Sequence, residues 1–190
     1  MIDAKTQYVS VCNCTETILV DKELADSFLQ KIVIELAKAN VKIYGDDYMT
    51  ARFNCEKVEN WHHEYLDYKV SVKIVDGLEA AIDHINTYGS GHTDAIITEN
   101  SEAAEKFMQT VDSSSVMVNC STRFADGFRY GFGAEVGVST SKIHARGPVG
   151  LEGLVSYKYR LIGHGDIVGD YASGKKSFKH INRRLTIKSQ

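Results

Sequence analysis

Four cysteines are the side chains in this sequence best suited to covalent chemistry, because a thiolate is both a nucleophile and a metal ligand. They are Cys12, Cys14, Cys55 and Cys120. Four cysteines in 190 residues are too few for a disulfide framework. The Cys12-x-Cys14 spacing does not fit a zinc knuckle, even with His62 and His63, so we expect no metal site. A free cysteine is more often buried and inert than catalytic, so residue type alone assigns no role.

A second group of polar side chains follows a stretch that has the pattern of a buried strand. It comprises Ser121, Thr122, Arg123 and Asp126. Open α/β sheets place ligand contacts beyond the ends of their strands, so we expect this group to bind a substrate. Arg123 offers a bidentate fork for a carboxylate and Asp126 a partner for an ammonium group, with a structural Arg123–Asp126 ion pair as the alternative. His92 and His144 are candidate proton donors, unless they only anchor loops.

Alternating strands and helices are expected to position these groups. Strand patterns cover residues 16–20, 41–44, 68–74, 95–98 and 116–119. Apolar spacing predicts three helices, Lys22–Ala39, Gly77–Tyr88 and Ser101–Val111. The first is capped by Asp21 and buries Leu24, Phe28, Ile32 and Leu36, and the second opens with a capping box at 76–79. Strands that alternate with such helices indicate βαβ units, so we predict an α/β fold with a mostly parallel sheet.

The chain changes character after Cys120, where seven glycines fall between positions 127 and 153. This spacing predicts a long ordered loop system, and such segments often carry function. Residues 154–162 alternate between apolar and polar types and predict another strand. The basic stretch 175–184 is typical of a solvated terminal extension, with a site for an anionic partner as the alternative.

Composition narrows the class of protein. The formal net charge is -3 and 43% of residues are hydrophobic, which fits one compact domain and argues against nucleic acid as a partner. No apolar run approaches the roughly 20 residues needed to span a bilayer. The first residues show neither a signal nor a transit-peptide pattern, so we expect a soluble, cytoplasmic protein with no membrane partner.

Four stretches of the sequence resemble γ-glutamyl phosphate reductase, a member of the aldehyde dehydrogenase superfamily. Residues 11–20 read VCNCTETILV, and residues 64–67 lead into the strand at Val70. Residues 75–98 read VDGLEAAIDHINTYGSGHTDAIIT, and residues 118–137 read VNCSTRFADGFRYGFGAEVG and continue into HARGPVGLEGL at 144–154. Matches of this length are specific. Cys14 and Cys120 stand where the family usually has alanine.

The resemblance implies a three-layer, aldehyde-dehydrogenase-like catalytic domain over residues 1–153, followed by an oligomerisation strand and basic tail over 154–190. It implies the NADPH-dependent reduction of γ-glutamyl phosphate to glutamate 5-semialdehyde, a step of proline biosynthesis. Cys12 would be the nucleophile, and Cys14 a small core residue. Glu64 would accept hydrogen bonds from the nicotinamide ribose of NADPH or NADP, with a solvated loop glutamate as the alternative.

The family carries a dinucleotide-binding domain before its cysteine, and eleven residues precede Cys12 here. We therefore expect the N-terminal cofactor-binding domain to be absent and the chain to be inactive without its missing half. A homo-oligomer, or a partner chain that supplies the cofactor domain, is the expected assembly. The alternatives are a non-catalytic partner or relic module, and the C-terminal piece of a bifunctional glutamate kinase–reductase, which would place the protein in mitochondria.

Overall fold

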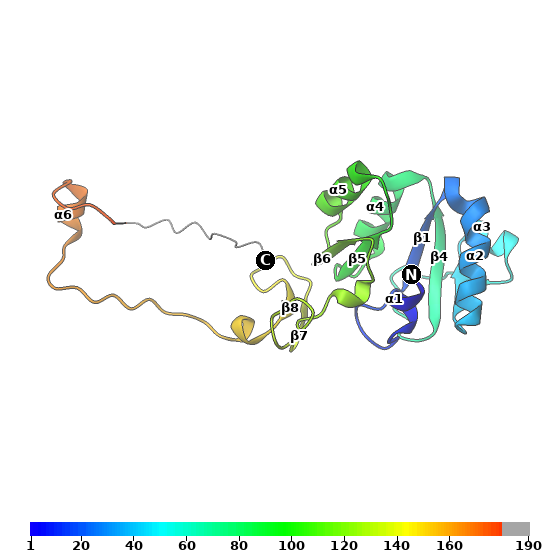
Figure 1. The fold of residues 1–190 in the computed structure, drawn as a ribbon, viewed down its shortest axis with the longest axis horizontal. Helices are drawn as coiled ribbons and strands as arrows, with labels where there is room; N and C mark the ends of the chain where they lie inside the picture. The colour runs from blue at the N-terminus through cyan, green and yellow to red at the C-terminus, as the bar shows by residue number, and fades with distance from the viewer. Residues whose placement is uncertain (180–190) are drawn as a thin grey trace, which may run out of the picture. The chain divides into compact units, whose positions relative to one another are not determined.

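The structure is a computed structural model and describes residues 1–179. The chain divides into two compact units, Met1–Val155 and Ser156–Gln190, and each is described by itself. Figure 1 shows the strands and helices of the first unit and labels α6 in the second. Within residues 1–179, no helix is long and apolar enough to cross a membrane.

The larger sheet of the first unit has the strand order β1-β4-β2-β3, and every pair is parallel. Its strands are β1 (Thr17–Asp21), β2 (Lys42–Gly45), β3 (Glu56–Lys57) and β4 (Lys69–Val75). In the register, Thr17 lies opposite Ser71 and Lys42 opposite Lys69. Helices at Ala25–Lys38 and Asp47–Arg52 make the connections from β1 to β2 and from β2 to β3, whereas residues 58–68 between β3 and β4 contain no helix.

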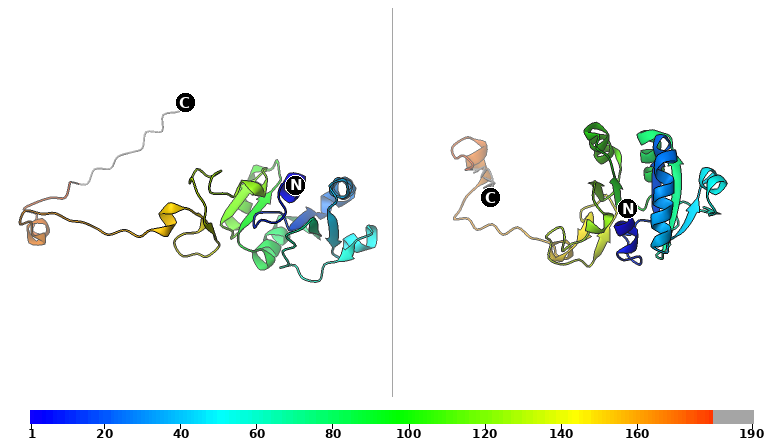
Figure 2. Two further views of the ribbon diagram at one scale, coloured as in Figure 1. Left: turned by 90° about the horizontal axis from the view of Figure 1, so that it is seen from below. Right: turned by 45° about the vertical axis from the view of Figure 1, so that its right-hand side comes forward.

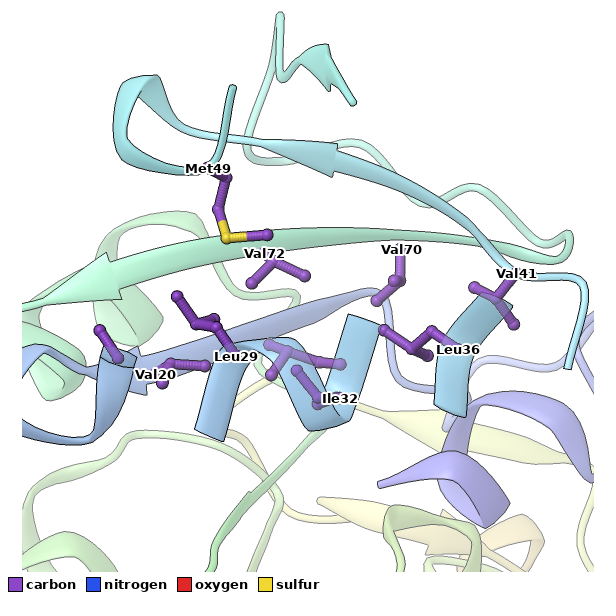
Figure 3. Packing of buried hydrophobic residues seen from close by; sticks show 10 residues of the cluster. Val20, Leu29, Ile32, Leu36, Val41, Met49, Val70 and Val72 are labelled. Atoms are coloured by element: carbon purple, nitrogen blue, oxygen red, sulfur yellow. The ribbon is translucent and has the colours of Figure 1, made fainter. Parts of the chain in front are cut away.

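Helix α2 (Ala25–Lys38) covers one face of this sheet and forms the main core with it. Figures 1 and 2 show the helix lying alongside β4. Figure 3 shows Leu29, Ile32 and Leu36 of the helix meeting Val70 and Val72 of β4. A short 3-10 turn, Lys22–Leu24, precedes the helix, and the Asp21 side chain accepts a hydrogen bond from the Glu23 N–H at 2.8 Å. Asp21 therefore caps this 3-10 turn, whereas the α-helix begins three residues later than predicted, and its N-cap residue Leu24 makes no side-chain cap hydrogen bond.

The predicted buried face of this helix is wrong at its first position. Leu24 is 54% exposed, whereas Ala25 and Leu29 are buried. Because Lys22–Leu24 forms a 3-10 turn with a tighter pitch, the α-helical spacing starts only at Ala25. A further short helix, α3 (Asp47–Arg52), is capped by the Asp46 side chain and brings Met49 into the core.

A second, two-stranded parallel sheet joins β5 (Thr93–Ile96) to β6 (Ser115–Val118). Helices α4 (Gly77–Tyr88) and α5 (Ser101–Thr110) pack with it around a small core of Ile82, Phe107 and Val111. The bounds of α4 agree with the sequence prediction, and α5 ends one residue earlier than predicted. The capping box at 76–79 is wrong, because the Asp76 side chain makes no cap hydrogen bond and Gly77 begins the helix at φ 81°.

The first unit has helices on both faces of its larger sheet. Val70 and Val72 of β4 point into the core formed with α2. Lys73, which alternates with them, lies over the Trp61 ring at 5.0 Å from its centroid, and Trp61 contacts His84 of α4 edge-on. Because successive strand residues point to opposite faces, α4 lies on the face away from α2. The predicted α/β class with a mostly parallel sheet is confirmed.

The glycine-rich segment is ordered and contains no α-helix between Cys120 and Gly153. It forms a 3-10 turn at Thr122–Phe124, an antiparallel pair of β7 (Gly137–Ser139) with β8 (Gly147–Val149), and a second 3-10 turn at Leu151–Leu154. Gly131, Gly133 and Gly147 adopt φ values of 82°, 78° and 84°, a region that side chains rarely occupy. The glycines therefore permit the turns of this segment.

The second unit contains one short helix, α6 (Val168–Ala172), within the described residues. The strand predicted over 154–162 is not formed, because Leu154 closes a 3-10 turn and residues 155–163 have no regular secondary structure. Tyr157, Tyr159 and Leu161 are 84%, 87% and 98% exposed. A strand requires a partner for its backbone groups, and the alternating sequence pairs with no strand among residues 1–179. Residues 180–184 of the predicted basic stretch lie outside the described residues.

Candidate functional site

A cleft of about 580 Å³ opens in the first unit between the two sheets. Residues of β1, β5, α4 and α5 form its walls, and the loop that carries Cys12 lies on its surface together with Glu64, Cys120 and Thr122. The cysteine loop, residues 11–16, connects α1 (Ile2–Thr6) to β1. The cleft thus brings together three segments that are far apart in the sequence, near residues 12, 64 and 120.

Hydrogen bonds fasten the cysteine loop to the 122–125 turn. The Thr122 hydroxyl donates to the Asn13 carbonyl at 2.7 Å, and the Asn13 amide nitrogen donates to the Ala125 carbonyl at 2.8 Å. The other end of the loop is held by the Thr15 N–H, which donates to the Ala4 carbonyl at 3.0 Å. The Asn13 Oδ1 atom is buried without a hydrogen-bond partner in the structure, so this amide has unused acceptor capacity beside Cys12.

The two cysteines of the loop differ in access. Cys12 is exposed and lines the cleft, whereas Cys14 is buried, and its Sγ lies 3.3 Å from the Lys5 carbonyl. Cys14 is therefore a small core residue, as the sequence analysis expected. Since a nucleophile must reach its substrate, Cys12 is the thiol of this pair that can perform covalent chemistry.

Electrostatics around Cys12 disfavour the thiolate in this chain. Partial burial raises the pKa of the Cys12 thiol above its ordinary value, and the Glu135 and Glu64 carboxylates raise it further. A backbone hydrogen bond and the Arg123 guanidinium act in the opposite direction and lower the same pKa. Glu135 is held in place by the Gly127 N–H, which donates to its Oε2 at 2.9 Å. The thiol is therefore mostly protonated at neutral pH.

A buried ion pair lies beneath the cysteine loop. The Lys5 side chain is fully buried, and its Nζ lies 3.2 Å from Glu16 Oε2. The same carboxylate accepts hydrogen bonds from the Tyr65 and Leu66 N–H groups at 3.1 and 3.2 Å. Burial raises the pKa of Glu16, while Lys5 and the two backbone donors lower it. Glu16 thus ties α1 and the cysteine loop to the segment that carries Glu64.

Sequence reasoning did not find this junction. Lysine is almost never fully buried unless it is paired, and nothing in the sequence around Lys5 marks it as different from a surface lysine. The signal available was the neighbouring Glu16, which lies within the 11–20 motif. Its contact to the loop at 65–66 crosses about 50 residues and follows only from the tertiary structure.

The structure separates the candidates near Arg123. Thr122 lines the cleft with Cys12 and Glu64, but Ser121, Arg123 and Asp126 do not. Ser121 caps the 3-10 turn, since its hydroxyl accepts from the Arg123 N–H at 3.4 Å. Arg123 donates from Nε to Gln7 Oε1 at 2.8 Å.

The alternative Arg123–Asp126 ion pair is not formed within the described residues. Asp126 instead lies 3.7 Å from Arg129 Nη1 and accepts from the Arg129 N–H at 3.1 Å. The three-residue spacing to Arg129 suits this pair because the intervening turn returns the chain toward the carboxylate. Arg123 is therefore not neutralised by Asp126.

The two candidate histidines also differ. His92 is buried, its Nδ1 lies 2.6 Å from the Thr93 hydroxyl, and its Nε2 has no hydrogen-bond partner in the structure. Burial lowers the pKa of His92, so the ring is neutral near pH 7, while Glu135 and Glu64 act weakly to raise that pKa. His144 is exposed in the loop between β7 and β8. Of the two, only His92 is held in a fixed orientation.

Comparison with known proteins gives first the class of protein. The chain superposes on the crystal structure of the γ-glutamyl phosphate reductase of Thermotoga maritima with a TM-score of 0.83 at 42% identity, covering 87% of this chain and 41% of that one. An acetylating aldehyde dehydrogenase from Geobacillus thermoglucosidasius gives a TM-score of 0.52 at 19% identity, over 86% of this chain. The chain therefore has the fold of aldehyde-dehydrogenase-like proteins.

Sequence comparison with curated proteins then gives the particular relative. The γ-glutamyl phosphate reductase of Acetivibrio thermocellus is 60% identical over 182 residues, and that of Ruminiclostridium cellulolyticum is 58% identical over 181 residues. No family model matches the chain. The matches cover 95% and 94% of this chain but 42% of each relative. The chain is thus similar, over nearly its whole length, to one part of γ-glutamyl phosphate reductase, and it spans under half the length of these relatives.

Proposed function

We propose that this chain supplies the thiol-bearing part of a γ-glutamyl phosphate reductase. The complete enzyme would reduce γ-glutamyl phosphate to glutamate 5-semialdehyde and phosphate with NADPH, in proline biosynthesis. The observation that carries the proposal is the position of Cys12, an accessible thiol on a cleft that Glu64 and Thr122 share, within a chain 60% identical to part of such a reductase. Cys14, two residues away, is buried.

Cys12 would act as the nucleophile. A bond forms between its Sγ and the γ-carbonyl carbon of the acyl phosphate, and the carbon–oxygen bond to phosphate breaks, so phosphate leaves with the bonding electrons. The product is a thioester on Cys12. No water enters the reaction, so this direction needs no general base for hydrolysis. Because the pKa of Cys12 is raised in this chain, the complete enzyme must supply a further positive or hydrogen-bonding group to favour the thiolate.

The described residues offer a contact for the nicotinamide end of the dinucleotide but not for its pyrophosphate and adenine. Glu64 is exposed on the cleft and offers two carboxylate oxygens, the acceptor set that a ribose diol requires. When bound, the reduced dinucleotide supplies the hydride that converts the thioester to the aldehyde. Two hydrogen bonds do not offset the several kcal/mol of freedom lost on association, so we expect other polypeptide to hold the pyrophosphate and adenine.

We assign recognition of the amino-acid end of the substrate to the 121–126 segment, of which Thr122 alone lines the cleft in the structure. The substrate carries an α-carboxylate and an α-ammonium group. Arg123 would bind the carboxylate by exchanging its Gln7 partner for the substrate, with Ser121 and Thr122 as further hydrogen-bonding groups. Asp126 would have to exchange its contact with Arg129 for the ammonium group. We also propose that residues 1–153 form the catalytic part, and that 154–162 becomes a strand when another subunit pairs with it.

The test is a chimera in which this chain replaces the matched part of the Acetivibrio thermocellus reductase. We expect NADPH oxidation that depends on γ-glutamyl phosphate, loss of this activity in Cys12→Ser, and retention of most of it in Cys14→Ala. An active Cys12→Ser chimera, or a dead Cys14→Ala chimera, would show that the nucleophile is assigned wrongly. A folded chimera without activity would favour a non-catalytic module.

A further inference from the structure

The cleft is bounded by two free sheet edges. In the larger sheet β1 pairs only with β4, and in the smaller sheet β5 pairs only with β6, so each strand has one edge without a neighbouring strand among the described residues. Both edges line the cleft, along residues 17–21 and 93–98. Unpaired strand edges of this kind are the usual template for the addition of a further strand.

The hydrogen-bond register identifies the backbone groups that face the cleft. The Glu16 carbonyl accepts from the Ser71 N–H of β4, and alternate residues of a parallel strand point to the same side. The backbone N–H and C=O groups of residues 18 and 20 therefore bond to β4, while those of Thr17 and Leu19 point into the cleft. On the other wall, the His92 carbonyl accepts from the Ser115 N–H of β6, and the Ile96 carbonyl accepts from the Asn119 N–H directly after β6. The backbone groups of Ala95 and Ile97 therefore point into the cleft. Two ladders of donors and acceptors thus line the same space.

Apolar side chains cover both faces of this space. Leu78, Ala81 and Ile85 of α4, with Phe107 of α5, lie on one side. Phe28 of α2 and Ala4 of α1 lie on the other. A strand placed here would be enclosed on both faces and paired at both edges, the environment of a central strand with a continuous apolar sequence.

We propose that the cleft binds an extended, apolar β-strand, supplied by the part of the reductase that this chain does not span. The inference rests on the proposed function, because the 42% coverage of the relatives is what shows that the reductase contains more polypeptide than is matched here. The inserted strand joins β1 to β5 and converts two sheets into one continuous sheet. It also lies next to the cysteine loop, so its insertion couples assembly of the enzyme to the position of Cys12.

Charge argues against two other occupants of the cleft, a dinucleotide and a second copy of this chain. The charged lining of the cleft consists of carboxylates, at Glu16, Asp21, Glu64 and Asp94, with no lysine or arginine among the lining residues that the structure describes. Glu16 is paired with Lys5, and the remaining carboxylates leave the space between β1 and β5 without a lysine or arginine, among the described residues, that could hold the pyrophosphate of a dinucleotide. A second copy of this chain could offer its exposed 155–161 segment, but that segment would place Lys158 and Arg160 against an apolar wall, which is costly without partners.

The first experiment compares amide hydrogen exchange in this chain with that in the full-length Acetivibrio thermocellus reductase. In this chain we expect the amides of Leu19, Ala95 and Ile97 to exchange rapidly, while those of Ile18 and Val20 are protected. In the reductase the counterparts of the first group should exchange at least about 100-fold more slowly. The measurement does not depend on catalysis, so it can fail independently of the proposed function.

Four results would overturn the proposal. Equal, rapid exchange in both proteins would mean that no strand inserts. If these amides are already protected in the isolated chain at every concentration, the chain closes the cleft by itself. If they are protected in the isolated chain only at high concentration, a second copy closes the cleft. Protection in the reductase that appears only after NADP⁺ is added would assign the cleft to the dinucleotide.

Proline substitutions provide a second experiment. Leu19→Pro removes an N–H that faces the cleft and leaves the β1–β4 ladder intact, so this chain alone should keep its melting temperature. In the chimera the same substitution should lower the melting temperature by about 5 °C or more. Lys57→Pro is the matched control, because the Val58 N–H bonds to β2 and residue 57 therefore points to the outer edge of the sheet. Equal effects of the two prolines in the chimera would overturn the proposal.

A further variant covers the case in which Leu19→Pro prevents folding. Ala81→Glu places a carboxylate on the α4 wall of the cleft, where this chain alone can leave it in water. In the chimera the same carboxylate would be buried against the inserted strand, so only the chimera should lose stability. An unchanged melting temperature of the Ala81→Glu chimera would contradict strand insertion.

Discussion

The two walls of the cleft differ in how far each completes its own core. The larger sheet and α2 enclose a cluster that includes Leu36, Val70 and Val72, all at 0% exposure. The smaller sheet with α4 and α5 encloses a smaller cluster of Ile82, Phe107 and Val111, and leaves further apolar side chains of α4 on the cleft. Both walls obey the same βαβ rules. The difference shows that local pattern forms each layer, whereas burial of a layer depends on what lies next to it.

Core truncation should show this difference most strongly. Leu36→Ala removes a fully buried side chain of α2, and we expect a loss of about 3 kcal/mol in the free energy of unfolding, because a cavity remains. Leu78→Ala, on the cleft wall of α4, should cost only about 1 kcal/mol because its side chain is partly exposed. Urea unfolding measures both. Equal losses would mean that the two walls are equally closed.

Breaking the Lys5–Glu16 ion pair beneath the cysteine loop should cause the next largest loss in the free energy of unfolding at neutral pH. Glu16→Gln leaves the Lys5 ammonium buried without a counter-charge, so we expect a loss of about 2–3 kcal/mol. The Tyr65 and Leu66 amides should also exchange faster with solvent, since a neutral amide accepts more weakly than a carboxylate. Glu35→Gln, which removes an exposed pair with Lys38, is the control and should cost less than about 0.5 kcal/mol. A similar cost for both variants would refute the structural role of Glu16.

Acid should weaken the α4 wall through His84. Burial, together with the nearby positive charges of Lys73 and His62, lowers the pKa of His84 from 6.5 to about 4. Between these two pH values the unfolded chain binds a proton that the folded chain does not, so stability falls as pH falls across this window. The expected loss between pH 7.5 and 4 is about 3 kcal/mol from this residue, and His92 adds to it in the same direction.

His84→Phe isolates this contribution. The substitution keeps an aromatic ring against Trp61, which now contacts the histidine edge-on, and removes the titrating group. Chemical denaturation at pH 7.5, 6 and 5 should give a flatter pH dependence than the unsubstituted chain. An unchanged slope would show that His84 is neutral for a different reason or that it titrates normally.

The smallest expected effect is on the reactivity of Cys12. Glu135→Gln removes a charge that raises the pKa of Cys12, so alkylation by iodoacetamide at pH 7.5 should become about two- to threefold faster. Arg123→Gln removes a charge that lowers this pKa and should slow alkylation by a similar factor. Cys12→Ser identifies the signal from this thiol. Rate changes of the same sign in both variants would contradict the charge assignments.

The sequence alone determined the elements and the motif of this protein. Helix Gly77–Tyr88 and strand Lys69–Val75 follow from periodicity, because a half-buried helix and a half-buried strand each impose a fixed spacing on apolar residues. The cysteine loop followed from the VCNCTETILV motif and its resemblance to the reductases. Prediction failed where local rules compete, as at Leu24, where a 3-10 turn shifts the buried face, and at Asp76, where Gly77 begins the helix without the predicted cap.

Tertiary structure decided which of these residues meet. Cys12 and Cys14 have the same side chain, and only packing against Lys5 makes the second inaccessible. The distances from Glu16 to residues 65 and 66, and from Asp126 to Arg129 instead of Arg123, depend on how loops return to the sheet. A sequence pattern reports which side of an element is apolar, because that is a local property. The partner of that side is set by the whole fold, and here two strand edges still face an open cleft.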